Sequence, residues 1–385
     1  MREDKERMAL FLAILITLTS VGVYPIVVQQ PLRDPWQVTD MDFTVNVSVK
    51  NLGLNPARDV PLRLALPMSD MDDQELLSYT FSEPLERESN DTLGNKFVHF
   101  VIPNIDPATE HVITMNISMR LWSVDYDIEP DMVGDYLGDQ DVWLAESTYI
   151  NVNDPIVQEV ADQIASESEW AVDIGWNTYT WIIDNIYYQQ IAGENDARST
   201  IELGEGGSAE FGNLFVALMR ANNIPARRLS GWGSHFDIDD SLPDNRFAHG
   251  WAEFYLPDVG WLTADPTWGI TNRFDNYGNS DDNHIVLTRG AGIHYRTRGP
   301  YSAPFGETTL DTDYDVWVTG KTEENLSPIR TVLTTILFAM PFIFALFVIS
   351  RVRTQRNEVS IDLTRPPLKL KEPLVAEAEP KPPPS

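Results

Sequence analysis

Apolar and polar residues alternate along the chain between Met41 and about Leu121. Such alternation puts every second side chain on the same face of an extended strand, and it is typical of antiparallel sheets with one buried face. Stretches rich in Asn and Pro separate the alternating runs, as turns would. We therefore predict a small antiparallel β-sandwich over residues 36–124. The positions expected to face its core are Phe43, Val45, Val47, Val49, Val60, Leu62, Leu64, Leu66, Ile113, Met115, Ile117, Met119 and Leu121.

The apolar residues follow a helical period in the middle of the chain. Asp154-Pro155 is a typical helix start, and a second helical stretch runs over about 170–188. A third helix is expected to begin after a glycine-rich turn at or near Ser208 and to end at Asn222-Asn223. The helix faces expected to be buried are Ile156, Val157, Val160, Ala161 and Ile164, then Phe211, Leu214, Phe215 and Leu218.

Two uncharged apolar runs, Met8–Val28 and Thr331–Ser350, are each about as long as a helix that spans a bilayer. Because basic residues gather on the cytoplasmic side of spanning helices, both chain ends are predicted to be cytoplasmic and residues 29–330 to lie outside. A cleaved signal peptide is the alternative for the first run. The flanking basic residues are Arg2, Lys5 and Arg7, then Arg351, Arg353 and Arg356.

The charge and the cysteine count exclude several classes of function. The formal net charge is −30, so nucleic acid would be repelled and is not expected as a partner. There is no cysteine, which excludes disulfides, thiolate metal sites and a thiol nucleophile. An apolar fraction of 43% is enough for a sizeable core.

Ser208 lies in a glycine-rich turn, GEGGSAEF, that leads into the third predicted helix. The first backbone N–H groups of a helix have no partner within it, and the helix dipole makes that end positive. A developing oxyanion could therefore be held beside Ser208. The alternative is that Ser208 only caps the helix.

His249 lies in a strand-like run, and Asp265 ends the next one after a turn at residues 257–260. Simple pairing across that turn would put Asp265 opposite Ala252, on the face away from His249. A one-residue bulge at Gly260 would bring Asp265 to the His249 face. A hydrogen-bonded His249–Asp265 pair therefore requires this bulge or an equivalent offset in strand register. Together with Ser208, the pair would supply a nucleophile, a base and a residue that orients the base.

The run GGSAEFGNLFVALMRANNIPARRLSGW and the later run AHGWAEFYLPDVGWLTADPTW resemble the transglutaminase-like superfamily of papain-type enzymes, above all its membrane-anchored archaeal and bacterial members. The resemblance covers roughly residues 150–300. It implies that His249 is the base and that Asp265 orients it. The family's nucleophile is a cysteine, and Ser208 stands in its place. The matching positions are Arg220, Ala221, Ile224, Pro225, Ala226, Arg227, His249, Trp251, Glu253, Gly260, Trp261, Asp265, Pro266 and Thr267.

The serine changes the expected chemistry, because a papain-type site depends on a thiolate–imidazolium pair and a hydroxyl has no ionised resting state. We therefore interpret the domain as a catalytically altered or silent module that binds extended peptide or glycopeptide at the cell surface. The first alternative is a Ser–His–Asp hydrolase or acyl transferase on peptide or amide bonds. The second is a structural or envelope-assembly protein. The expected partner is a cell-surface peptide, protein or glycopeptide.

No cofactor or metal is predicted. Two acidic loop clusters offer oxygens that calcium prefers, but neither has the spacing of an EF-hand, so solvated loops are favoured. His284 and His294 lack a persuasive metal-ligand spacing. The two clusters are Asp237, Asp239, Asp240 and Asp244, and separately Asp275, Asp281 and Asp282.

The fold class predicted is α+β, with a transglutaminase-like domain of the papain type preceded by an antiparallel β-sandwich and flanked by two transmembrane helices. The predicted parts are a cytoplasmic stub and anchor over 1–28, the sandwich over 36–124, the transglutaminase-like domain over 150–305, a juxtamembrane linker over 306–329, a transmembrane helix over 330–350 and a disordered cytoplasmic tail over 351–385.

Overall fold

The computed structural model describes residues 33–126, 128, 141–191, 194–234, 241–242, 248–290, 295–297, 309–326, 343–344 and 346–351. The described residues up to 326 belong to one compact unit and those from 343 onward to another, and each unit is described by itself.

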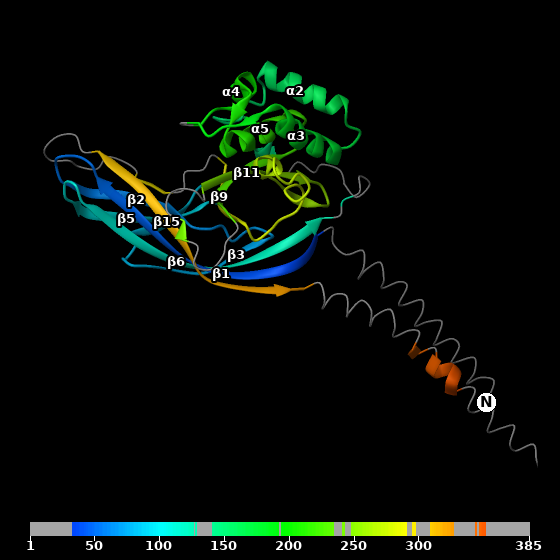
Figure 1. Cartoon of the computed structure of the whole chain (residues 1–385), viewed down its shortest axis with the longest axis horizontal. Coiled ribbons are helices and arrows are strands. Elements are labelled where there is room, and N and C mark those ends of the chain that lie inside the picture. Colours follow the sequence, from blue (N-terminus) through cyan, green and yellow to red (C-terminus); the bar gives the residue numbers. More distant parts are fainter. Residues whose placement is uncertain are drawn as a thin grey trace, which may run out of the picture. The chain divides into compact units, whose positions relative to one another are not determined.

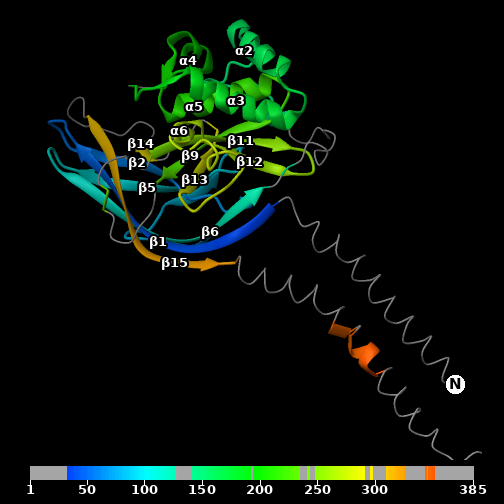
Figure 2. The same cartoon turned by 45° about the vertical axis from the view of Figure 1, so that its right-hand side comes forward.

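Two antiparallel sheets form the lower layers of the first unit in Figures 1 and 2. One has the strand order β10-β15-β1-β6-β3 and the other the order β14-β2-β5-β4. The strands are β1 (Arg33–Asn51), β2 (Ala57–Ala65), β3 (Gln74–Phe81), β4 (Arg87–Asn90), β5 (Lys96–Ile105), β6 (Glu110–Tyr126), β10 (Ser241–Leu242), β14 (Tyr295–Thr297) and β15 (Leu310–Asn325).

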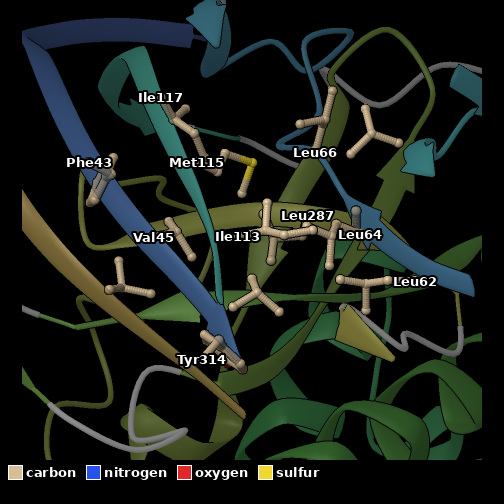
Figure 3. Packing of buried hydrophobic residues seen from close by; sticks show 14 of the residues in the cluster. Phe43, Val45, Leu62, Leu64, Leu66, Ile113, Met115, Ile117, Leu287 and Tyr314 are labelled. Carbon is tan, nitrogen blue, oxygen red and sulfur yellow. The ribbon is translucent and has the colours of Figure 1, made fainter. Parts of the chain in front are cut away.

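The apolar positions of these strands pack into one core. Every position predicted from the alternation to face inward is buried, with at most 1% of its surface exposed. Figure 3 shows Phe43 and Val45 of β1 and Ile113 of β6 directed into the same core as Leu62 of β2. Burial of each such side chain stabilises the fold by roughly 1.5–3 kcal/mol. The period-two prediction is therefore confirmed at these positions.

The segment predicted as a linker, 306–329, contains a strand of this sandwich. β15 pairs with β1 along its length, from Asn51 opposite Leu310 to Gln37 opposite Asn325. Tyr314, Val316 and Val318 of β15 are buried in the core. The alternation in β15 covers only these three positions and is flanked by charged residues, so the sequence pattern did not reveal it. The sandwich is thus completed by strands that follow the central part of the chain.

A four-stranded antiparallel sheet with the order β12-β11-β9-β13 lies between the sandwich and the helices (Figures 1 and 2). One of its faces contributes Ala252 and Phe254 to the core shared with the helices. The other contributes Trp232, Ile285 and Leu287 to the sandwich core. These strands are β9 (Ala226–Gly233), β11 (Ala248–Leu256), β12 (Gly260–Ala264) and β13 (His284–Arg289).

The helices cover the outer face of this sheet, and α5 lies innermost, packed against β9, β11 and the helices around it. The prediction assigned one buried face to this helix, whereas all its residues from Glu210 to Arg220 are buried. The remaining elements are η2 (Asp141–Trp143), α2 (Pro155–Ser166), α3 (Ala171–Asn185), β7 (Tyr187–Tyr188), α4 (Ala197–Leu203), β8 (Glu205–Gly206), α5 (Ser208–Ala221) and α6 (Pro266–Gly269).

The predicted transmembrane segments lie largely outside the described residues. The run Met8–Val28 is not among them, and of the run Thr331–Ser350 they include 343, 344 and 346–350, which are helical. Leu346 of this helix is 66% exposed in the chain on its own. Within the described part of the chain we find no helix with the length and apolarity needed to cross a bilayer. Both spans and the tail over 351–385 stay predictions.

The role of β15 can be tested with a matched pair of substitutions. Val316→Thr keeps the shape of a buried residue but places a hydroxyl in the apolar core, and it should lower the free energy of unfolding by about 1–3 kcal/mol. Thr322→Val, on the same strand at an exposed position, should change it by less than about 0.5 kcal/mol. Chemical denaturation of the full-length chain measures both. Equal, small effects would contradict the packing of β15 in the sandwich.

Candidate active site

The predicted register offset between the strands of His249 and Asp265 is present. Leu256 of β11 lies opposite Gly260 of β12, and Ala252 lies opposite Ala264. Gly260 has a φ of 106°, a conformation that favours glycine and lets the turn close one residue early. Asp265 therefore follows β12 on the His249 face, and His249 Nε2 lies 2.7 Å from Asp265 Oδ2. The prediction of a hydrogen-bonded pair is confirmed.

Asp265 is fully buried, and both of its carboxylate oxygens have partners. Oδ1 accepts hydrogen bonds from the backbone N–H groups of Thr267 (2.9 Å) and Trp268 (3.2 Å), which cap α6. Oδ2 faces the imidazoles of His249 (2.7 Å) and His284 (3.2 Å). Burial alone would raise the pKa of Asp265, but the two imidazoles outweigh it and hold the pKa far below its ordinary value. The carboxylate therefore stays ionised at neutral pH.

His284 is a site residue that the sequence analysis missed. Its Nδ1 lies 2.8 Å from Asp281 Oδ1, while its Nε2 faces Asp265. Burial would lower the pKa of His284, but the carboxylates of Asp281 and Asp265 outweigh it and raise that pKa to about 10. His284 begins β13, which pairs with β9 on the side opposite β11. No local pattern predicts this pairing, so its position beside Asp265 was not expected.

A glycine in the strand between the two histidines lets them approach each other. Gly233 of β9 lies opposite His284, and a Cβ atom placed on it would lie only 2.8 Å from the His249 ring. His249 also stacks on the indoles of Trp251 and Trp268, with ring centroids 5.6 and 5.3 Å away. Its ring is therefore held on several sides. Trp251 itself is buried.

Ser208 is the first residue of α5, and Gly207 rather than Ser208 takes the N-cap position. Glu210 accepts a hydrogen bond from the Gly207 backbone N–H at 2.8 Å and so completes the cap. The hydroxyl of Ser208 forms no hydrogen bond with another described residue. Hence the capping alternative for Ser208 is wrong, and its hydroxyl stands at the positive end of the helix.

Ser208 and His249 line the same cleft, which has a volume of about 520 Å³. Gly207 and Thr267 also line it, and Tyr188 and Ile191 add apolar surface. Asp265 lies behind His249, out of solvent. The structure therefore brings the three predicted residues together: Ser208 and His249 share a cleft, and Asp265 is hydrogen-bonded to His249.

Buried ion pairs hold the strands and helices around this cleft. Glu253 pairs with Arg227 at 2.6 Å, and both side chains are nearly inaccessible to solvent. Glu253 is therefore a structural carboxylate with its charge paired. Arg228 pairs with Glu194 at 2.7 Å, next to α5. Breaking either pair would leave a buried charge without compensation.

Of the predicted acidic clusters, the first lies outside the described residues, since Asp237, Asp239, Asp240 and Asp244 are not among them. In the other, Asp281 pairs with His284, and Asp282 accepts a hydrogen bond from Thr39 at 2.9 Å. Among the described residues, His249, Asp265 and His284 place ligand atoms within 4.8 Å of one another, a spacing that can suit a metal ion. The two hydrogen bonds of 2.7 and 3.2 Å engage these atoms with one another. We therefore treat the group as a hydrogen-bonded chain.

A sequence model described as "Transglutaminase-like superfamily" matches residues 158–266, which contain Ser208, His249 and Asp265. Uncharacterized protein YebA of Bacillus subtilis (strain 168) is 29% identical over 111 residues, which are 26% of this chain and 14% of that protein. Protein-glutamine gamma-glutamyltransferase of Pseudomonas aeruginosa is 34% identical over 68 residues, which are 17% of this chain and 10% of that protein. The chain therefore matches only a small part of the length of either relative.

Among solved structures, a proposed cysteine protease from Cytophaga hutchinsonii is 17% identical, with a TM-score of 0.49, over 74% of this chain and 99% of that chain. The periplasmic domain of TgpA from Pseudomonas aeruginosa is 16% identical, with a TM-score of 0.32, over 60% of this chain and 91% of that chain. The sequence match by itself assigns residues 158–266 to a transglutaminase-like superfamily domain.

Proposed function

We propose that this chain is a membrane-anchored, extracytoplasmic Ser–His–Asp enzyme that transfers or hydrolyses acyl groups at peptide or amide bonds. The observation behind the proposal is the 2.7 Å hydrogen bond that joins His249 to the buried Asp265, with His249 and Ser208 in one cleft. Ser208 corresponds, in this proposal, to the nucleophilic cysteine of the family. A buried carboxylate such as Asp265 costs desolvation energy that an apolar residue would not, which favours a chemical role for it.

Each residue has a defined task in this reaction. The oxygen of Ser208 attacks the carbonyl carbon while its proton passes to Nδ1 of His249, because Nε2 is engaged with Asp265. The free backbone N–H groups at the start of α5 stabilise the oxyanion that forms. His249 then gives the proton to the departing amine. Water or a second amine releases the acyl group from Ser208, which makes the enzyme a hydrolase or a transferase.

The cleft favours an extended substrate. Its lining includes Gly207 and the polar side chains of Thr267 and Thr271, together with apolar surface from Tyr188 and Ile191. Extended peptide, alone or carrying a glycan, offers the amide carbonyls that this chemistry needs. We therefore propose a cell-surface peptide, protein or glycopeptide as the partner.

The second candidate is a silent cleft that binds such a peptide without cleaving it. The serine itself favours this candidate, because a site that relies on a thiolate loses its nucleophile when oxygen replaces sulfur. The missing hydrogen bond between Ser208 and the described residues agrees with either candidate, since catalytic hydrogen bonds often form only in the substrate complex.

Labelling with a fluorophosphonate probe tests the enzyme proposal. We expect the wild-type chain to be labelled, and Ser208→Ala to abolish labelling because the attacking oxygen is gone. Asp265→Asn should slow labelling by roughly 10³–10⁴-fold, since His249 would lose the partner that sets its tautomer. The matched control is Ser230→Ala, a buried serine of β9 away from the cleft lining, which should keep its label. Persistent labelling of Ser208→Ala would refute the assignment.

The silent-cleft candidate makes the opposite prediction. Here the wild type remains unlabelled, and Ser208→Cys gains amidase activity toward a chromogenic peptide amide, because a thiol ionises near neutrality beside an imidazole. Binding of Ser208→Ala to a peptide array would then show that the cleft is a recognition site. If neither the wild type nor Ser208→Cys were active and Ser208→Ala bound no peptide, both the enzyme proposal and the silent-cleft candidate would be refuted.

The membrane topology can be tested because the chain contains no cysteine. The variants Thr322→Cys and Ser385→Cys each introduce a single cysteine. Each cysteine can be probed on intact cells with a maleimide that does not cross membranes. We expect Thr322→Cys, exposed on β15, to be labelled at once, and Ser385→Cys only after lysis. Labelling of both on intact cells would contradict a cytoplasmic carboxyl terminus.

A further inference from the structure

The hydrogen-bond partners of His284 determine its charge. Nδ1 faces Asp281 Oδ1 at 2.8 Å and Nε2 faces Asp265 Oδ2 at 3.2 Å. An ionised carboxylate only accepts hydrogen bonds, so each ring nitrogen has to donate one. The pKa of Asp281, like that of Asp265, is lowered despite burial, so both carboxylates are ionised at neutral pH. His284 therefore carries two N–H groups and a positive charge.

The same reasoning fixes the tautomer of His249. Its Nε2 shares the Asp265 Oδ2 atom with His284, and this oxygen can only accept. The proton of neutral His249 is therefore on Nε2, which leaves Nδ1 as the basic nitrogen. That is the nitrogen required to receive the proton of Ser208.

We propose that His284 is a positioning residue of the active site, whose positive charge fixes the Asp265 carboxylate and offsets its negative charge, so that His249 remains a neutral base. This inference rests on the proposed function, and it names a residue outside the matched region 158–266. A hydroxyl nucleophile needs such a neutral base, whereas a thiolate site needs the imidazolium form in its resting state.

The compensation of the Asp265 charge by His284 follows from the charged groups that contact the two histidines. Without His284, the buried Asp265 carboxylate would act on His249 with no second cation beside it, and it would favour the protonated form of His249. With His284 present, a positive charge lies 3.2 Å from the same Asp265 oxygen and offsets its negative charge. This arrangement ties the charge state of His249 to His284.

Other charged or titratable groups around the site have partners of their own. Glu210 of α5 accepts hydrogen bonds from Gly207 and Asn195, and Arg228 of β9 pairs with Glu194. Burial raises the pKa of Tyr179 on α3 far above its ordinary value, so Tyr179 is neutral. None of these hydrogen bonds and ion pairs involves His284.

Thermal unfolding tests the charge of His284 without any assay of activity. The pKa of His284 is raised from 6.5 to about 10 in the folded chain, so its contribution to stability is complete below about pH 6.5 and is lost as the pH rises through about 10. The difference in Tm between the wild type and His284→Gln should therefore shrink steadily from pH 6 to pH 10. A difference that does not change over this range would overturn the charge assignment.

The pH profile of fluorophosphonate labelling of the full-length chain tests the positioning role. His284→Gln keeps a neutral donor but removes the charge, so the acidic limb of the profile should move upward by about one pH unit or more, and labelling below that limb should slow about tenfold. His284→Ala, which removes the donor as well, should show at least the same shift. His111→Asn, on β6 of the sandwich, is the control and should leave the profile in place.

The outcomes separate this inference from the proposed function. A profile unchanged in His284→Gln, with a folded and labelled protein, would overturn the positioning role while the enzyme proposal stands. A wild type that is never labelled would overturn the enzyme proposal and the positioning role with it, and the Tm series alone would then decide the charge of His284. A shift in both His284 variants and none in His111→Asn would support the inference.

Discussion

The site depends on one buried carboxylate. Asp265 has no exposed surface, and it is stabilised by two backbone N–H groups of α6 on one oxygen and by two imidazoles on the other. A buried ion without such partners would cost several kcal/mol. Because Asp265 remains charged, it fixes the tautomer of His249, the charge of His284 and the start of α6 together.

The layered fold makes this arrangement possible. The four-stranded sheet has one face in the core of the helices and the other in the core of the sandwich, so its strands are held on both sides. Since β11 and β13 both pair with β9, the two histidines reach Asp265 from neighbouring positions across a glycine. The innermost helix, α5, then presents Ser208 at the edge of the same sheet. The sandwich thereby supports the four-stranded sheet directly.

In the proposed function a hydroxyl at position 208 replaces the thiol of the family, and the charges around His249 agree with that proposal. A thiolate site gains from a strongly negative environment of its histidine, which favours the imidazolium form. Here a second imidazole shares the carboxylate, and the negative charge near His249 is smaller. The two observations concern residues far apart in the sequence, Ser208 and His284, and both favour chemistry through a neutral base.

Local patterns in the sequence determined much of this protein. The period-two alternation identified the buried positions of β1, β2 and β6, because strand geometry acts over a few residues. For the His249–Asp265 pair the sequence stated only the register offset that the pair would require, and the structure has that register. Only the tertiary structure decided what depends on distant pairing. The β15–β1 ladder joins residues more than 250 positions apart, and β13 brings His284 to Asp265 through β9. No local period specifies such partners, since they are selected by the packing of the whole core.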